Sequence, residues 1–178
     1  RRFDLRITTA GGRVTIDGTG ACPESQPAFG VSLSRHLRIE NIVLRGNPEG
    51  AGFLVDHSGD IRFTNVTASG FAGCGLVSTL SVVGLFVDLS RFTDNSGGGL
   101  CLNGNGLWIT GTTTDRNGPG GIVLQGVPGG VAMNAFVSRS LAGSDQPAGI
   151  TAQAPGGLNN LVVTRSTFGA RGVPPRAG

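Results

Sequence analysis

The sequence contains no lysine and no tyrosine, and it has only two histidines, one tryptophan and one methionine. The acid or base groups that remain besides carboxylates are His36 and His57, and no Ser-His-Asp arrangement can be built around them. No apolar run approaches about 18 residues, so neither a membrane-spanning helix nor a signal peptide is expected in this stretch. The arginines are scattered along the chain, which does not indicate a nucleic-acid-binding tract.

Helix-forming segments are also scarce. The 178 residues include 32 glycines and nine prolines, which cost about 1 and about 3 kcal/mol, respectively, in a helix interior. We therefore expect almost no α-helix. Charged residues make up only 14% of the chain, and threonine, serine and asparagine alternate with apolar residues, which is typical of strands with a solvated outer surface.

Two stretches of the chain share one design. Residues 85–102 read LFVDLSRFTDNSGGGLCL, and residues 107–124 read LWITGTTTDRNGPGGIVL. Each opens with an apolar-x-apolar pair, turns near an asparagine and restarts at a glycine that precedes a second apolar-x-apolar pair. Internal similarity of this kind predicts a repeat architecture.

The same design extends through the chain as three columns of like residues. The opening apolar residues are Val14, Leu37, Ile61, Leu85, Leu107, Val131 and Leu161. Their partners two positions later are Ile16, Ile39, Phe63, Val87, Ile109, Met133 and Val163. The restart glycines are Gly30, Gly52, Gly75, Gly99, Gly121 and Gly149. Because alternate side chains point to one face of a strand, each repeat should contain two or three short strands.

Stacking of the repeats at about 4.8 Å would place each apolar column inside a coil as a ladder. We therefore predict an all-β, single-domain solenoid over residues 1–178, with about seven coils. At that spacing its length would be on the order of 30 Å.

The register resembles the right-handed parallel β-helix superfamily, whose fold is pectate-lyase-like. The closest motifs are DNSGGGLCL and RNGPGGIVL, and the resemblance covers about residues 5–168. It implies a fold and leaves the activity open, because this scaffold supports many functions. A leucine-rich repeat is the alternative, since residues 39–47 fit its core pattern, but no spaced leucines follow them.

The predicted rod has irregular parts. We expect loop insertions at residues 21–29 and 140–149 and a loosely ordered tail at residues 170–178. Leu5 and Ile7 are interpreted as the end of an earlier coil. No amphipathic helix is available to cap the strand edges at either end, so we expect a fragment or a subunit of a longer rod.

Three cysteines, Cys22, Cys74 and Cys101, allow one disulfide in any of three pairings. Cys74 and Cys101 fall in adjacent coils but at different places in the repeat. We therefore expect small thiols rather than a bridge. The spacing of cysteine and histidine does not suit zinc, and no metal site is predicted.

One outward column combines arginines with aromatic residues. Its members are Arg38, Arg62, Phe86, Trp108, Ala132 and Val162. Phe86 and Trp108 should be neighbours, and such a pair beside Arg62 forms a platform on which sugar rings stack. Contact with a neighbouring chain or with an overlying loop is the equal alternative.

A second outward column is apolar throughout, at Leu54, Val77, Cys101 and Val123. An exposed column of this kind favours a covering segment or an interface with another copy.

The candidate catalytic residues are Asp94, Asp115, Arg116 and Arg139. Asp94 and Asp115 should lie about 6 Å apart in consecutive coils, a separation within the range that glycoside hydrolysis needs. The resemblance implies that a lyase would use an arginine base, with calcium as the possible cofactor. The sequence motifs of pectin-type enzymes of this fold are absent. A plain salt-bridged surface is the alternative, since Asp94 lies one coil from Arg116 at the same repeat position.

Two functional hypotheses follow. The first is a secreted or cell-surface rod with a structural or adhesive role that associates with other copies or binds polysaccharide, without a cofactor. The second is a polysaccharide lyase or glycoside hydrolase that acts in a groove along the coil.

Overall fold

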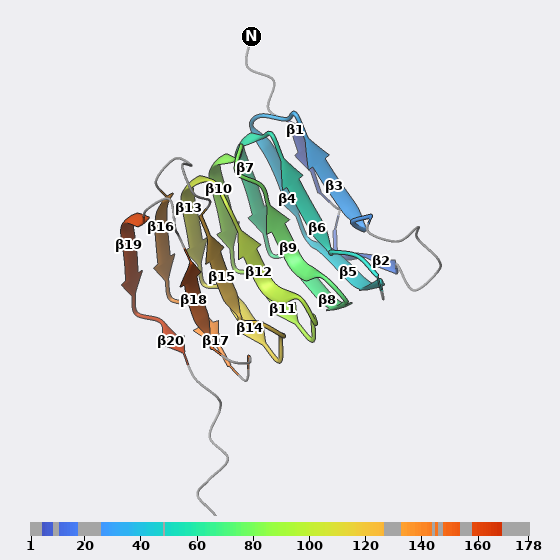
Figure 1. Cartoon of the computed structure of the whole chain (residues 1–178). Helices are drawn as coiled ribbons and strands as arrows, with labels where there is room; N and C mark the ends of the chain where they lie inside the picture. Colours follow the sequence, from blue (N-terminus) through green and yellow to red (C-terminus); the bar gives the residue numbers. More distant parts are fainter. Residues whose placement is uncertain are drawn as a thin grey trace, which may run out of the picture.

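The computed structural model describes residues 5–8, 11–17, 26–47, 49–126, 133–143, 145, 148–153 and 158–168. Within these ranges the chain is all-β, as predicted, and its strands stack as the rungs of one parallel solenoid (Figure 1). No helix in this part of the chain is long and apolar enough to cross a membrane. The predicted tail at residues 170–178 and most of the predicted loop at residues 21–29 lie outside the described residues.

Three parallel sheets form the walls of the solenoid. Sheet A contains β1 (Leu5–Ile7), β4 (Leu37–Glu40), β7 (Gly59–Thr64), β10 (Val83–Asp88), β13 (Asn105–Thr110), β16 (Met133–Ser138) and β19 (Leu158–Thr164). Sheet B contains β2 (Val14–Asp17), β5 (Ile42–Asn47), β8 (Thr67–Phe71), β11 (Arg91–Thr93), β14 (Thr113–Asp115), β17 (Leu141–Ala142) and β20 (Thr167–Phe168). Sheet C contains β3 (Phe29–Ser32), β6 (Phe53–Asp56), β9 (Cys74–Ser78), β12 (Gly98–Leu102), β15 (Ile122–Gln125) and β18 (Ile150–Gln153).

Within the described residues sheet C has six strands, so this part of the chain makes fewer complete three-stranded turns than the seven predicted. The predicted loop at residues 140–149 contains the short strand β17, which pairs with β14. Phe29, at the end of the other predicted loop, begins β3 and pairs with Phe53.

The inner columns stack as predicted through the middle of the rod. Ile39, Phe63, Val87 and Ile109 pair in order along sheet A, and all four are fully buried. Apolar side chains of this size contribute about 1.5–3 kcal/mol each when they leave water. Since one coil cannot enclose its own apolar side, the stack is the source of stability.

The predicted columns are wrong at two places. Val14 pairs with Ile42 in sheet B, and the sheet A positions belong to Leu5 and Ile7, which pair with Leu37 and Ile39. The interpretation of Leu5 and Ile7 as the end of an earlier coil is therefore also wrong. The connection from β2 to β3 makes this first coil longer than the others. Counting back from Leu37 by the usual repeat length therefore reaches Val14 instead of Leu5.

The second error lies near the other end. Ala135 and Val137 occupy the column that was assigned to Val131 and Met133, because they pair with Leu107 and Ile109. Val131 itself lies outside the described residues. Val131 with Met133 and Ala135 with Val137 both have the apolar-x-apolar spacing of a strand. The connection between β15 and β16 is longer than in the preceding coil, so the second pair reaches the column.

The restart glycines have a steric cause in a buried ladder. Asn95 and Asn117 follow β11 and β14, and Asp145 follows β17 at the same place. A Cβ on Gly75 would lie 2.9 Å from the amide nitrogen of Asn95, and one on Gly121 would lie 2.3 Å from a carboxylate oxygen of Asp145. Glycine is therefore required where the ladder side chain of the next coil occupies the space. Gly30 does not belong to this column, since it pairs with Leu54.

The ladder satisfies its own polar groups. The Oδ1 atom of Asn117 accepts bonds from the backbone N–H and the side-chain amide of Asn95, both at 3.0 Å. The carboxylate of Asp145 accepts bonds from the backbone N–H of Asn117 at 2.9 Å, from its side-chain amide at 2.7 Å and from the Thr114 hydroxyl at 2.8 Å. The three ladder residues are at most 5% exposed. Full satisfaction is what makes buried polar side chains tolerable in this core.

Candidate functional site

The outer face of sheet A carries one continuous row of side chains. In register, its members are Arg6, Arg38, Arg62, Phe86, Trp108, Phe136 and Val162. The row contains the predicted residues Arg62, Phe86 and Trp108 in the predicted order. Phe136 occupies the place that was assigned to Ala132, which lies outside the described residues. The row therefore changes from cationic to aromatic along the rod.

At the centre of the row, Arg62, Phe86 and Trp108 form a stack. The rings of Phe86 and Trp108 are nearly parallel, with centroids 4.7 Å apart, and the guanidinium carbon of Arg62 lies 4.6 Å from the Phe86 centroid. Because Arg62 and Trp108 come from the two strands that flank β10, they approach Phe86 from opposite sides. Phe86 therefore offers no free ring face, unlike the open platform that was expected.

Trp108 is the aromatic residue that remains open. Its side chain lies over Gly106, where a Cβ would come within 2.8 Å of the indole, and Trp108 is 39% exposed. Beyond the indole is a shallow apolar hollow of about 150 Å³ between Trp108 and Phe136. Leu107, Ala135 and Val162 complete its apolar lining, and Asn134 and Asn160 are its polar members.

The polar rim of this hollow is an amide row. The side-chain nitrogen of Asn160 donates to Oδ1 of Asn134 at 2.9 Å, and Asn134 donates in the same way to Asn105 at 2.8 Å. Each amide retains a further donor hydrogen and acceptor lone pairs for other partners. The hollow thus combines an apolar wall with neutral hydrogen-bonding groups.

The cationic half of the row contains two ion pairs. Arg6 pairs with Glu40, and Arg62 pairs with Asp88 at 3.1 Å. A second hollow of about 140 Å³ adjoins this part, lined by His36, Arg38, Asp60, Arg62 and Phe86.

The predicted catalytic carboxylates lie at a different corner, between sheets B and C. Asp94 and Arg116 occupy the same repeat position, and the guanidinium of Arg116 donates to both oxygens of Asp94 at 2.7 and 2.8 Å. Arg116 also donates to the carboxylate of Asp115. The structure thus brings these three predicted residues together as an ion-paired cluster.

The ion pair at this corner favours the charged forms of Asp94 and Arg116. The hydrogen bonds from Arg116 lower the pKa of Asp94, and Asp94 raises the pKa of Arg116. A general acid requires the opposite shift in its carboxyl pKa. Arg139 is not part of the cluster, because it lies in the turn between sheets A and B, with a φ of 48°. The catalytic assignment stays a prediction.

The two histidines lie near the corner between sheets C and A. Nδ1 of His57 is 2.8 Å from a carboxylate oxygen of Asp56, and His36 lies 3.2 Å from Asp60. The Thr79 hydroxyl donates to Asp56 at 2.6 Å and, together with His57, lowers the pKa of that carboxyl. In each pair the carboxylate contacts the histidine. Among the described residues, no serine or threonine hydroxyl is hydrogen-bonded to either histidine, so neither pair has a nucleophile beside it.

The comparisons with known proteins identify the fold family. A family model described as right-handed beta helix region matches residues 51–172, which is well over half of the chain. The chain belongs to the right-handed β-helix family. No curated protein and no solved structure matches it. This β-helix therefore takes its fold from the family, while its function has to be argued from its own surface.

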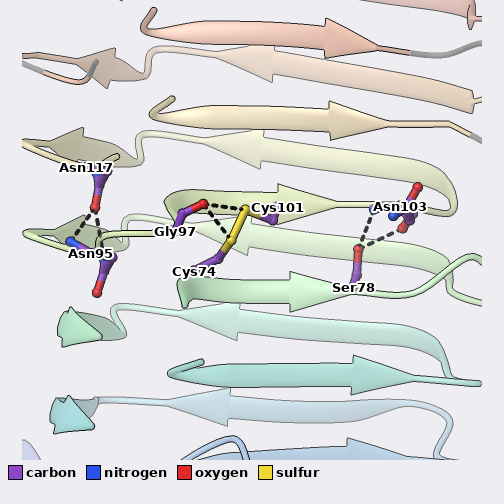
Figure 2. The surroundings of a disulfide bond; sticks show 7 residues. All are labelled: Cys74, Ser78, Asn95, Gly97, Cys101, Asn103 and Asn117. Atoms are coloured by element: carbon purple, nitrogen blue, oxygen red, sulfur yellow. Dashed lines mark hydrogen bonds between the residues drawn. A yellow bond between two sulfur atoms is a disulfide. The ribbon is translucent and has the colours of Figure 1, made fainter. Parts of the chain in front are cut away.

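The β-helix contains a disulfide where thiols were expected. Cys74 and Cys101 are joined across adjacent coils, with their Cα atoms 6.0 Å apart (Figure 2). Cys74 pairs with Gly98, and a Cβ on Gly98 would lie 2.9 Å from the Cys101 sulfur and 3.5 Å from the Cys74 sulfur, so the absence of a side chain at Gly98 leaves room for the bond. The two cysteines occupy different positions in the repeat, which argued against a bridge, but their side chains are close enough to form one. The expectation of small thiols was therefore wrong for this pair.

The disulfide also bears on the apolar outer column. Cys101 and Val123 are buried, at 7% and 6% exposure, although alternation directs them outward. The Cys74 sulfur covers Cys101. Gly120, in the turn before β15, lies against Val123, since a Cβ on this glycine would be 3.1 Å from the Val123 side chain. Leu54 and Val77 remain half-buried. This column is therefore less exposed than the sequence suggested.

The site contains residues that the sequence analysis missed. Phe136 and Asn134 were missed because one repeat was misplaced, whereas Asn160 directly precedes the correctly placed Leu161. The motif AFVSRS at residues 135–140 matches LFVDLS at residues 85–90, and this similarity was the available signal. Among the described residues, no group of three or more histidine, cysteine or acidic side chains is placed to hold a metal ion.

Proposed function

We propose that this β-helix binds a polysaccharide on the outer face of sheet A and acts as a secreted or cell-surface rod. The observation that carries the proposal is the hollow between Trp108 and Phe136, rimmed by Asn134 and Asn160. A pyranose ring has apolar C–H faces that pack against an indole, and hydroxyl groups that bond to amides. A solvent-exposed apolar wall with satisfied but still available amides suits such a ligand.

The cellular setting of the proposal rests on the disulfide. Disulfides persist mainly in oxidising compartments, including the extracellular space. The Cys74–Cys101 bond therefore supports a secreted or surface location. An adhesive role is the simplest use of a rod that binds a polymer and whose described residues include no general acid placed beside a base.

The test is binding to a glycan array, followed by titration calorimetry with the best ligand. Trp108→Ala should lower the affinity about tenfold, which corresponds to about 1.4 kcal/mol, the order expected when the apolar contact with the indole is lost. Leu80→Ala is the matched control, because Leu80 is also an exposed apolar residue and lies outside the hollow. Equal affinities of the wild type and Trp108→Ala, or the absence of binding to any glycan on the array, would reject the proposal.

The second candidate is a polysaccharide lyase or hydrolase that uses Asp94, Asp115 and Arg116, with calcium in the case of a lyase. The gathering of two carboxylates around one arginine favours it. Incubation with uronate and neutral polysaccharides, with and without added calcium, tests it. Unsaturated products or new reducing ends that disappear in Asp94→Asn would support it, and their absence from the wild type would remove it.

A further inference from the structure

We infer that Asn103 is a site of chemical modification, at which the backbone nitrogen of Gly104 displaces the side-chain amide as ammonia. The product is an aspartate or an isoaspartate in the turn between β12 and β13. This inference does not depend on the proposed function. It starts from one dipeptide, asparagine followed by glycine, which occurs three times in the chain, at Asn103, Asn105 and Asn117.

The reaction needs a free backbone nitrogen beside a carboxamide that is not held in place. The nitrogen of the following residue gives up its proton to solvent base and forms a bond to the side-chain carbonyl carbon. The carbon–nitrogen bond of the carboxamide then breaks, and its nitrogen takes up a proton and leaves as ammonia. Water opens the five-membered imide at either carbonyl, so that one water is consumed for each ammonia released. A following glycine favours this ring closure, because it has no Cβ beside the attacking nitrogen.

The backbone of Asn103 is fixed, whereas its carboxamide is not. Its N–H donates to the backbone and hydroxyl oxygens of Ser78 at 3.1 and 3.0 Å, and its carbonyl oxygen accepts a bond from that hydroxyl at 2.7 Å (Figure 2). The Oδ1 atom of Asn103 is buried without a hydrogen-bond partner. Among the described residues, nothing bonds to the side-chain nitrogen of Asn103 or accepts a bond from the Gly104 N–H. Both residues are half-buried, so solvent can reach the reacting groups.

Asn117 has the same neighbour in the sequence and opposite surroundings in the fold. The Gly118 N–H donates to the backbone oxygen of Asn95 at 2.8 Å. The Asn117 carboxamide bonds within the buried ladder through both its nitrogen and its oxygen, and the residue is only 3% exposed. Ring closure at Asn117 therefore requires a local opening of the coil, as the exchange of a protected amide hydrogen does.

Asn105 lies between these two extremes. Its Oδ1 atom accepts a bond from Asn134 at 2.8 Å, which holds its carboxamide on one side. Gly106 belongs to β13 and lies under the indole of Trp108, where a Cβ would come within 2.8 Å of the ring. The order of conversion in the folded protein is therefore Asn103 first, Asn105 second and Asn117 last.

Modification of Asn103 would disturb the start of β13. Isoaspartate adds an atom to the main chain, and aspartate introduces a charge where Oδ1 is already buried without a donor. An unpaired charge is costly in such a place. The N–H of Asn105, which donates to the backbone oxygen of Val82 at 2.9 Å, is the nearest bond that a longer main chain would displace. The modified chain should therefore unfold at a lower urea concentration than the unmodified chain.

The experiment follows all three asparagines in one sample. The purified chain, with its disulfide intact, is incubated in mildly alkaline buffer made with water enriched in heavy oxygen, so that conversion before digestion is marked by the isotope. After reduction, cleavage behind each arginine separates Asn117 from the peptide that carries Asn103 and Asn105. Fragment-ion mass spectrometry then distinguishes the latter two. Asn103 should convert at least about tenfold faster than Asn117.

Two controls assign this difference to the fold. In the reduced chain unfolded in urea, Asn103 and Asn117 should convert at similar rates, because their surroundings are then alike. Asn103→Gln keeps the carboxamide but has to close a larger ring, so conversion at this position should stop. Asn105→Gln is the matched variant and should leave the rate at Asn103 unchanged. Thermal melting of each variant confirms that it is folded.

Three results would each overturn the assignment of Asn103. The first is an equal rate at Asn103 and Asn117 in the folded protein. The second is faster conversion at Asn105 than at Asn103. The third is an intact Asn103 in the folded protein after a time in which the unfolded chain has converted. None of these results bears on glycan binding, so the failure of this inference and that of the proposed function are distinguishable.

Discussion

The buried ladder of Asn95, Asn117 and Asp145 and the outer row that contains Arg38 and Trp108 are built by the same rule, since each coil contributes one residue. They differ in what they leave unsatisfied. Inside, the Asn95 and Asn117 amides and the Asp145 carboxylate each bond to the ladder residue of an adjacent coil. Outside, the row includes an arginine with no ion pair among the described residues and an indole with an open face. The inner column is built to hold the chain together, and the outer one has capacity for a partner.

The substitution with the largest expected effect breaks the inner ladder. Asn117→Ala would leave the backbone N–H of Asn95 and the carbonyl oxygen of Phe92 without these partners inside the rod, and the Asp145 carboxylate with one donor fewer. Such groups cost about 1–3 kcal/mol each when buried, and more when charged. We expect the free energy of unfolding in urea to fall by about 3–4 kcal/mol. Asn160→Ala, in the outer amide row, is the control and should cost under about 1 kcal/mol. A loss below about 1 kcal/mol in Asn117→Ala would mean that the ladder is not structural.

The disulfide comes next. The double substitution of Cys74 and Cys101 by serine opens a loop with a sequence separation of 27 residues. The chain-entropy model predicts a loss of about 3 kcal/mol in the free energy of unfolding. Chemical reduction of the wild type should give a similar shift in the urea midpoint. Glycan binding should persist at low urea, because the bond lies on sheet C. A loss of glycan binding in the folded variant would show that the outer face of sheet A depends on the disulfide.

A smaller stability effect is expected in the outer row. Trp108→Ala removes a half-exposed ring and its stack on Phe86, which is worth about 0.5–1.5 kcal/mol beyond area burial. We expect a loss of about 1–2 kcal/mol in thermal or urea unfolding, together with the loss of glycan retention. If Trp108→Ala lost as much unfolding free energy as Asn117→Ala, the outer row would be as important for stability as the buried ladder. The proposed difference between the two columns would then be wrong.

The smallest effect concerns the exposed ion pair of Asp94 and Arg116. Because the folded-state pKa of Asp94 is lowered by Arg116, its contribution is complete above its ordinary pKa and disappears as the pH falls through the lowered value. Exposed pairs contribute about 0.2–1 kcal/mol. Asp94→Asn should therefore be less stable than the wild type by under about 1 kcal/mol at pH 7, and the difference should shrink as the pH falls below the ordinary range of an aspartate carboxyl. A difference that grows toward acid would show that the direction of the pKa shift is wrong.

The regular part of this fold could be predicted because its cause is local. Alternation of apolar residues such as Ile61 and Phe63 fixes which side chains enter the core, and the near-constant spacing fixes their stacking. The pairing of Asp94 with Arg116 followed from the same register. Errors arose where a connection lengthened a coil, as before Leu37 and before Ala135. There, two apolar pairs satisfied the same period, and only three-dimensional packing selected one.

Other features left no periodic signal. Asp145 completes the ladder through atoms of Thr114 and Asn117, which belong to another coil, and its own neighbours in the sequence resemble an ordinary polar loop. The Cys74–Cys101 bond joins positions that are not equivalent in the repeat. The ring stacking of Phe86 on Trp108 depends on side-chain angles that a pattern of residue types does not contain.

The equal contribution of every coil to each column has a consequence for how such a protein would grow. Duplication of the segment from Leu85 to Gly106, which is one full repeat, would lengthen the inner ladder and add one rung to the outer face in a single step. A polymer lying along the axis would then be held at more points, and its residence time would rise through multivalency. In such a molecule the strength of attachment could be tuned by gene length alone, with no change to the chemistry of any individual contact.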